Sequence, residues 1–138
     1  MEEIIEFDLQ AMFSQFMSEN FTIFVVAIAF ILLDIATGII VAILQRNFSS
    51  TIMRRGLGHK LGYVFVMCAV AILQVGMMEP SFHVEFDFPL FDVVCAFVIF
   101  MEFMSVMENA CLLNPQLNNL VGKFLAQNNY DEIEEVDE

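Results

Sequence analysis

Positive charge is scarce in this 138-residue chain, which has only five Lys and Arg residues against 18 Asp and Glu. The resulting net charge of −13 leaves no broad basic surface that could neutralise nucleic-acid phosphates. We therefore expect no nucleic-acid partner. Most of the acids gather at the two ends of the chain, where acidic runs are typical of solvated tails.

Cysteine and histidine are also few, and their spacing excludes the usual sites. Cys68, Cys95 and Cys111 form an odd set in apolar surroundings without a Cys-x-x-Cys pair, which is typical of small buried hydrophobes. His59 and His83 stand beside no metal-ligand or nucleophile pattern, and the mid-chain glycines lack the Lys-Ser/Thr ending of a phosphate loop. The sequence therefore predicts no enzyme, no metal site and no cofactor.

Apolar residues, by contrast, are in excess. They make up 59% of the chain, and the mean hydropathy is +0.72, well above the composition of ordinary globular domains. A soluble domain of this size could not bury so much apolar surface. We predict an all-α integral membrane protein with about three transmembrane helices preceded by an N-terminal amphipathic helix.

Three apolar segments carry the membrane prediction. They cover residues 21–44, 61–78 and 90–107, and as helices they reach about 27–36 Å, close to the roughly 30 Å hydrocarbon core. Acidic residues interrupt the first and third segments. We expect these spans to make up one membrane domain over residues 21–114.

The two ends of the chain differ from this domain. Residues 1–20 alternate apolar and polar side chains at helical spacing, which predicts a helix that either lies in the membrane interface or packs against a neighbouring subunit. Residues 115–138 are polar, and we expect a short cytoplasmic helix followed by an acidic tail.

Topology follows from the few basic residues. Arg46, Arg54, Arg55 and Lys60 all fall in the turn-prone stretch 45–60, which contains no acid. Loops rich in Lys and Arg face the cytoplasm, so we place the N-terminus outside and the C-terminus in the cytoplasm. These residues are expected to anchor the loop at anionic lipid headgroups.

Asp34 is the most informative single residue. A carboxyl group near the middle of a span costs about 2.5–3.5 kcal/mol on insertion scales, so it should face protein or water rather than lipid. Thr37 and Gly38 follow it on the same helix face. Two roles remain open: a structural hydrogen bond to a neighbouring helix, or a position on a water-lined path. Small residues that would let helices approach closely are Gly38, Ala42, Gly58 and Gly62.

Glu102 presents the same question in the third span, where Ser105 and Asn109 share its face. No Lys or Arg lies within the predicted spans to pair with Asp34 or Glu102. Both acids are therefore expected to rely on hydroxyl groups, backbone, water or protonation.

Several short motifs follow one another in a familiar order. They are Asp34-x-x-Thr37-Gly38, Arg46-Asn47-Phe48-Ser49-Ser50, Ser105-Val106-Met107-Glu108-Asn109-Ala110 and Asn114-Pro115. This succession, over roughly residues 33–122, resembles the phage lysis and toxin-secretion holin family. The acidic C-terminal run departs from that family, whose members usually end in Lys and Arg.

The resemblance implies a homo-oligomer in the bacterial inner membrane that opens a lesion or pore, through which an endolysin reaches the cell wall or a protein leaves. Family-pattern positions would be Asp34, Gly38, Ser49, Ser50, Glu108 and Asn109. The alternative is a non-lytic membrane scaffold, or a subunit of a larger complex, whose acidic ends bind a partner. A selective channel or transporter is less favoured because no internal repeat is visible.

Overall fold

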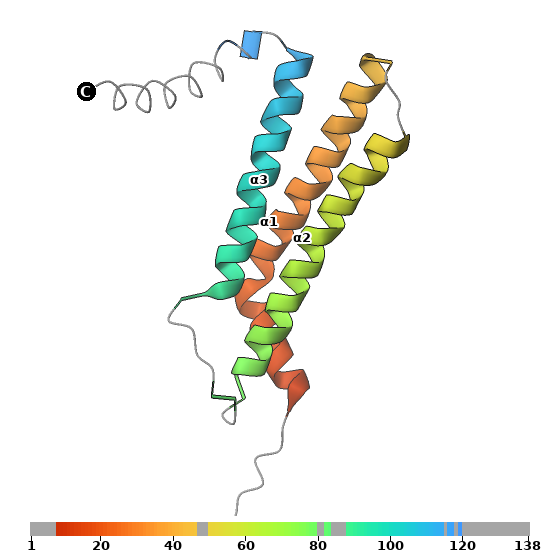
Figure 1. Ribbon diagram of the computed structural model, residues 1–138. Helices are drawn as coiled ribbons and strands as arrows, with labels where there is room; N and C mark the ends of the chain where they lie inside the picture. The colour runs from red at the N-terminus through yellow and green to blue at the C-terminus, as the bar shows by residue number, and fades with distance from the viewer. Residues whose placement is uncertain are drawn as a thin grey trace, which may run out of the picture.

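The computed structural model describes residues 8–46, 50–79, 82–83, 88–114, 116–117 and 119. Over these residues the chain forms three helices: α1 (Leu9–Leu44), α2 (Ser50–Met77) and α3 (Leu90–Leu113). Figure 1 shows them side by side as an up-down-up bundle in which consecutive helices run antiparallel.

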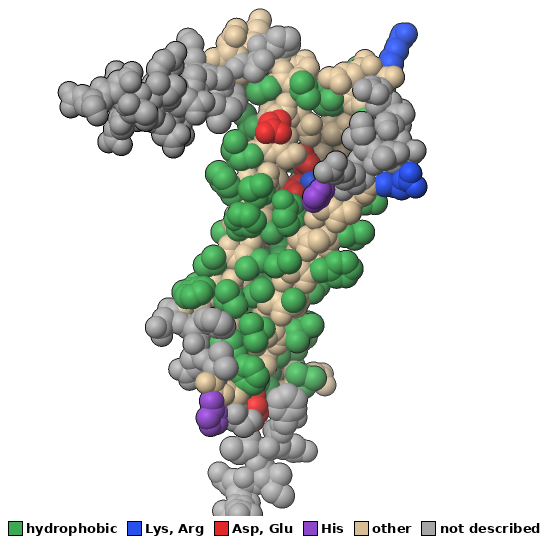
Figure 2. All heavy atoms as spheres, in the orientation of Figure 1, with side chains coloured by type: hydrophobic (Ala, Val, Ile, Leu, Met, Phe, Trp, Pro, Cys, Tyr) green, Lys and Arg blue, Asp and Glu red, His purple; other side chains and the backbone are tan. Residues whose placement is uncertain are grey.

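All three helices are long and apolar enough to cross a membrane. Large hydrophobic side chains point away from the bundle, including Phe65, which is 69% exposed, and Ile72, which is 74% exposed. Figure 2 shows hydrophobic side chains in a broad band along the middle of the molecule, with charged groups toward the two ends. An exterior of large apolar side chains suits lipid rather than water. The three helices confirm the predicted all-α membrane fold.

The N-terminal segment differs from the prediction, because no break separates it from the first span. Its described part, from Leu9 onward, continues directly into the span as one 36-residue helix. The sequence offers nothing to interrupt α1, since it contains no proline and no glycine before Gly38. Asp8 caps the helix, and its Oδ1 accepts a hydrogen bond from the backbone N–H of Ala11 at 3.0 Å.

The apolar face of this N-terminal part packs within the same chain. Phe16 is only 2% exposed, and its ring meets Phe91 of α3 edge to face with centroids 5.0 Å apart. The adjoining Asn20 is also buried and donates its side-chain N–H to the carbonyl of Phe16. Part of this segment's apolar face is therefore buried within the bundle, while Leu9 and Phe13 stay more than half exposed.

The predicted loop over residues 45–60 is wrong in extent. Helix α2 begins at Ser50 rather than near Leu61, so Arg54 and Lys60 lie on a helix. The glycines that suggested a turn cost about 1 kcal/mol each in a helix relative to alanine, and the following apolar turns outweigh that cost. Helix α3 likewise continues to Leu113, and only Asn114, with extended backbone ahead of Pro115, ends it.

Packing is uneven across the bundle. Helix α1 packs most extensively against α3, α2 contacts α3 less, and α1 and α2 barely touch. The buried apolar core runs between the helices as Phe16, Ala27, Ile31, Met67, Val75, Phe91, Cys95 and Val98. Helix α3 therefore holds the other two together.

Candidate functional site

Three charged side chains, one from each helix, meet inside the bundle. The ammonium Nζ of Lys60 on α2 lies 2.6 Å from Oδ2 of Asp34 on α1 and 2.5 Å from Oε2 of Glu102 on α3. All three are shielded from the surface, since the exposed fractions of these side chains are 13% for Lys60, 8% for Asp34 and 2% for Glu102. We refer to Asp34, Lys60 and Glu102 as the charge cluster.

Hydrogen bonds from Asn109 and Thr37 complete the contacts of Asp34. Asn109 on α3 donates from Nδ2 to Oδ1 of Asp34 at 2.8 Å and to Oγ1 of Thr37 at 3.1 Å. Thr37 in turn donates to the backbone carbonyl of Asp34. Both carboxylate oxygens of Asp34 are thus paired, one with Lys60 and the other with Asn109.

Gly38 lies where this network joins α1 to α3. A Cβ atom built on Gly38 would meet Nδ2 of Asn109 at 3.7 Å, an ordinary contact distance. The small residue predicted for close helix approach therefore stands at the α1–α3 interface. Alanine would also fit there.

The cluster sits toward the end of the bundle where α1 and α2 are joined. Asp34 lies ten residues before the end of α1, and Lys60 ten residues after the start of α2, or about 15 Å from each helix end. Glu102 lies at a similar depth, about 17 Å before the end of α3. Figure 2 shows acidic and basic side chains meeting between the helices in the upper part of the bundle.

Because the charge cluster is buried, its stability depends on how closely the charged groups are paired. Removing an ion from water costs several kcal/mol even after relaxation, and only close pairing with further hydrogen bonds repays that cost. The charge cluster meets this condition: every buried side-chain N and O atom of the described residues has a hydrogen-bond partner. Lys60 is shared by the two carboxyl groups, and Asp34 gains a further hydrogen bond from the amide of Asn109.

The expectation that Asp34 and Glu102 lack a basic partner is therefore wrong. It rested on placing Lys60 in a loop, and the earlier start of α2 puts this residue on a helix. A signal was present: Lys60, Met67 and Gln74 recur every seven residues on one helix face, and Met67 is completely buried. Extending the face of Met67 two helical turns toward the N-terminus places Lys60 on the interior side.

Gln74, which the sequence analysis passed over, marks the other end of this face. Its Oε1 accepts a hydrogen bond from the backbone N–H of Phe91 at 3.0 Å. Pro89 at the start of α3 offers no capping side chain, so α2 supplies the missing acceptor. The inner face of α2 thus pairs polar groups with α3 near both ends.

The remaining predicted site residues lie apart from the cluster. Among the described residues, nothing lies within 4 Å of a Cβ atom built on Gly58 or Gly62, so the helix-packing role predicted for these glycines has no described partner within the bundle. Ser105 and Ala42 are half-buried, and Arg46 and Arg54 are exposed. Ser49 and the side chains of Ser50 and Arg55 lie outside the described residues.

No group of three or more His, Cys, Asp and Glu side chains in the described part of the chain could hold a metal ion. The arrangement of the charge cluster is that of an interhelical ion-pair network.

Comparison with known proteins gives one finding. The model of the bacteriophage holin family matches residues 11–129, which include α2, α3 and all but the first two residues of α1. No curated protein and no solved structure matches the chain.

Lys60→Met tests how much the charge cluster stabilises the bundle. We expect a loss of about 3–5 kcal/mol of unfolding free energy, because two buried carboxylates would face each other without a cation. Denaturant titration of the protein in detergent micelles, followed by circular dichroism, measures the loss.

His59→Gln serves as the matched control, since His59 is the exposed neighbour on the same helix. The triple variant Asp34→Asn/Lys60→Met/Glu102→Gln should recover most of the stability, because no charge is left unpaired. Equal stability of Lys60→Met and His59→Gln would contradict a structural role for the cluster.

Proposed function

Because this chain belongs to the bacteriophage holin family, we propose that it oligomerises and opens a lesion in the bacterial inner membrane for release of an endolysin or another protein. The family and the three apolar helices make it a multi-pass protein of that membrane. Its lipid-facing surface is apolar, so a single bundle offers no polar wall to a water-filled opening.

The observation that carries the proposal is the charge cluster. It places three ionisable side chains, one from each helix, inside the bundle, where charged groups are costly to keep and where the described residues form no metal site. In water the three side chains would carry no burial cost. Their ion pairs would then contribute only about 0–1 kcal/mol, so little free energy would be lost if the pairs separated there. Separation of the helices would turn Asp34, Lys60 and Glu102 toward an aqueous lumen in the assembly.

Assembly also needs a face on which copies meet. Gly58 and Gly62 lie one turn apart on α2, and the space beside both is open. In lipid, helices associate where small residues let their backbones approach, so this flank is the contact we propose between copies. It lies on the same helix as Lys60, which links assembly to the charge cluster.

The orientation we propose follows the basic residues. Arg46 and Arg54 are exposed at the end of the bundle where α1 joins α2. This end would face the cytoplasm, and the end carrying Asp8 and His83 would face outward.

Release of a trapped dye from lipid vesicles tests lesion formation. We expect the chain to empty vesicles cooperatively as its density rises. Gly58→Ile/Gly62→Ile should act about tenfold more slowly, the equivalent of about 1.4 kcal/mol of association free energy, because bulky side chains hold the copies apart.

The control for this prediction is Leu57→Ile, an exposed position on the same helix that lies about 100° around the helix axis from Gly58. Chemical cross-linking of the same samples reports assembly separately from leakage. Vesicles that stay sealed at high protein density, with copies cross-linked or not, would contradict the lesion and favour a non-lytic scaffold.

Maleimide labelling tests the orientation. In a background with the native cysteines replaced by alanine, a membrane-impermeant maleimide should label His83→Cys in intact spheroplasts. It should label Gln45→Cys only after permeabilisation, since Gln45 lies at the end that carries the arginines. The opposite pattern would show that the positive charge does not set the topology here.

A further inference from the structure

The side of α2 that points away from the charge cluster carries an arginine, a glycine and an aromatic ring. Arg54, Gly58 and Phe65 follow one another at i, i+4 and i+11, which places them on one side of the helix. They lie about 120–160° around the helix axis from Lys60. All three are exposed. We call this side, which includes the flank of Gly58 and Gly62, the α2 outer face.

Helix α3 has an exposed side with the same spacing, and it carries an acid in place of the arginine. Phe97, Met101 and Glu108 also recur at i, i+4 and i+11. They lie about 100–140° around the axis of α3 from Glu102, so this side too points away from the charge cluster. All three are exposed, and we call this side the α3 outer face.

Contacts inside the bundle show how the levels of α2 and α3 correspond. The two helices run antiparallel (Figure 1), and Lys60 of α2 contacts Glu102 of α3. Further along, Gln74 of α2 contacts the backbone of Phe91 of α3. The steps from the first contact to the second are about 21 Å along α2 and about 16 Å along α3, so both contacts give the same register to about one helical turn.

This register places opposite charges at one level and two aromatic rings at another. Arg54 stands six residues before Lys60, and Glu108 stands six residues after Glu102. Phe65 stands five residues after Lys60, and its counterpart on α3, five residues before Glu102, is also a phenylalanine. The two outer faces therefore match each other in depth.

Matched depth decides which faces can meet between copies. Copies inserted in one orientation share a common depth, so Arg54 of one copy is level with Glu108 of another. Two α2 outer faces against each other would bring arginine to arginine, and two α3 outer faces would bring glutamate to glutamate, which is repulsive in both cases. An α2 outer face against an α3 outer face pairs opposite charges.

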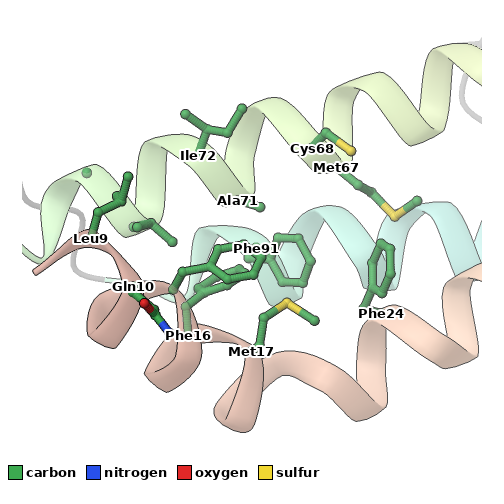
Figure 3. Close-up of a pocket in the computed structure, with 13 residues that line it drawn as sticks. Leu9, Gln10, Phe16, Met17, Phe24, Met67, Cys68, Ala71, Ile72 and Phe91 are labelled. Carbon is green, nitrogen blue, oxygen red and sulfur yellow. The ribbon is translucent and has the colours of Figure 1, made fainter.

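The apolar groove between α1 and α2 offers no such guide. It lies at the end of the bundle away from the charge cluster, and Figure 3 shows Phe16 and Phe24 of α1, Ala71 of α2 and Phe91 of α3 around it. No charged side chain lines this groove, so nothing in it selects a partner or sets a register.

We propose that the α2 outer face of one copy packs against the α3 outer face of the next, with Arg54 paired to Glu108 and Phe65 beside Phe97. The inference rests on the oligomer of the proposed function and names the two faces that meet in it. Nothing in the described part of the bundle lies within 4 Å of a Cβ atom on Gly58, so Met101 of the next copy has room there. Because the two faces differ, each copy uses both, and the contact repeats head to tail until the rotation closes a ring.

Disulfide formation between single cysteines tests which faces meet. In the background without native cysteines, Phe65→Cys copies are mixed with Phe97→Cys copies in lipid vesicles and oxidised with copper phenanthroline. We expect the mixture to give at least about fivefold more dimer than either variant alone, the equivalent of about one exposed ion pair. The double variant Phe65→Cys/Phe97→Cys should give a ladder of products beyond the dimer, because each copy then carries both halves of the contact.

Ile72→Cys is the control for depth. Ile72 is exposed on the same side of α2, seven residues after Phe65 and therefore about 10 Å away along the helix. A disulfide needs Cα atoms within about 7 Å, so Ile72→Cys copies should give little dimer with Phe97→Cys copies.

Charge exchange in the same mixture tests the ion pair. Arg54→Glu on the Phe65→Cys copies should lower the cross-linked fraction about fivefold, and adding Glu108→Arg to the Phe97→Cys copies should restore it. Arg46→Glu is the matched control, because Arg46 is an exposed arginine at the same end of the bundle but lies outside α2. It should leave the cross-linked fraction unchanged.

Three results would overturn this contact. Phe65→Cys copies that dimerise as well alone as in the mixture would show that α2 meets α2. Equal cross-linking at positions 65 and 72 would show that the copies collide without a fixed register. A loss by Arg54→Glu that Glu108→Arg does not restore would show that the two charges are not paired.

Leakage of dye from the same vesicles separates this inference from the lesion. The expected cross-links in vesicles that keep their dye would support the contact and contradict the lesion. Dye release without the expected cross-links would overturn the contact and leave the lesion standing.

Discussion

The structure depends on one ammonium group held between two carboxylates. Lys60 joins Asp34 and Glu102, and in doing so it joins α2 to both other helices. Each ionised acid would be costly against hydrocarbon, and two carboxylates facing each other would repel without a cation between them. The polar contact therefore favours one rotation of each helix about its axis.

This constraint explains the unequal ends of the molecule. At the end where α1 joins α2, ion pairs and the Asn109 network tie all three helices together. At the opposite end an apolar groove lies between α1 and α2, and the Phe16–Phe91 ring contact and the Gln74–Phe91 hydrogen bond join them to α3. Water entering from the end that carries the ion pairs would weaken the bundle where its cohesion is polar.

The sequence predicted what depends on local pattern and missed what depends on helix rotation. Three apolar stretches of sufficient length required three helices, and the polar face of Asp34, Thr37 and Gly38 was visible from spacing alone. The partner of Asp34 was not visible, because its position depends on where α2 begins. Three glycines near Lys60 favour a loop, whereas the residues between them favour a helix. Sequence alone does not decide between the two, and in the structure this stretch is helical. The continuous α1 was missed because a change in composition near residue 20 resembled a boundary, although no residue there breaks a helix.

The length of α1 has a mechanical consequence. Its 36 residues extend about 54 Å, and α2 and α3 are shorter, while the hydrocarbon layer measures about 30 Å. A bilayer of given thickness can match the three helices only by a compromise of tilt, protrusion and local stretching, each of which costs a fraction of a kcal/mol per ångström. Bilayers of different thickness therefore impose different mismatch energies on this bundle. The lipid composition of the host membrane then affects which arrangement of the helices is favoured.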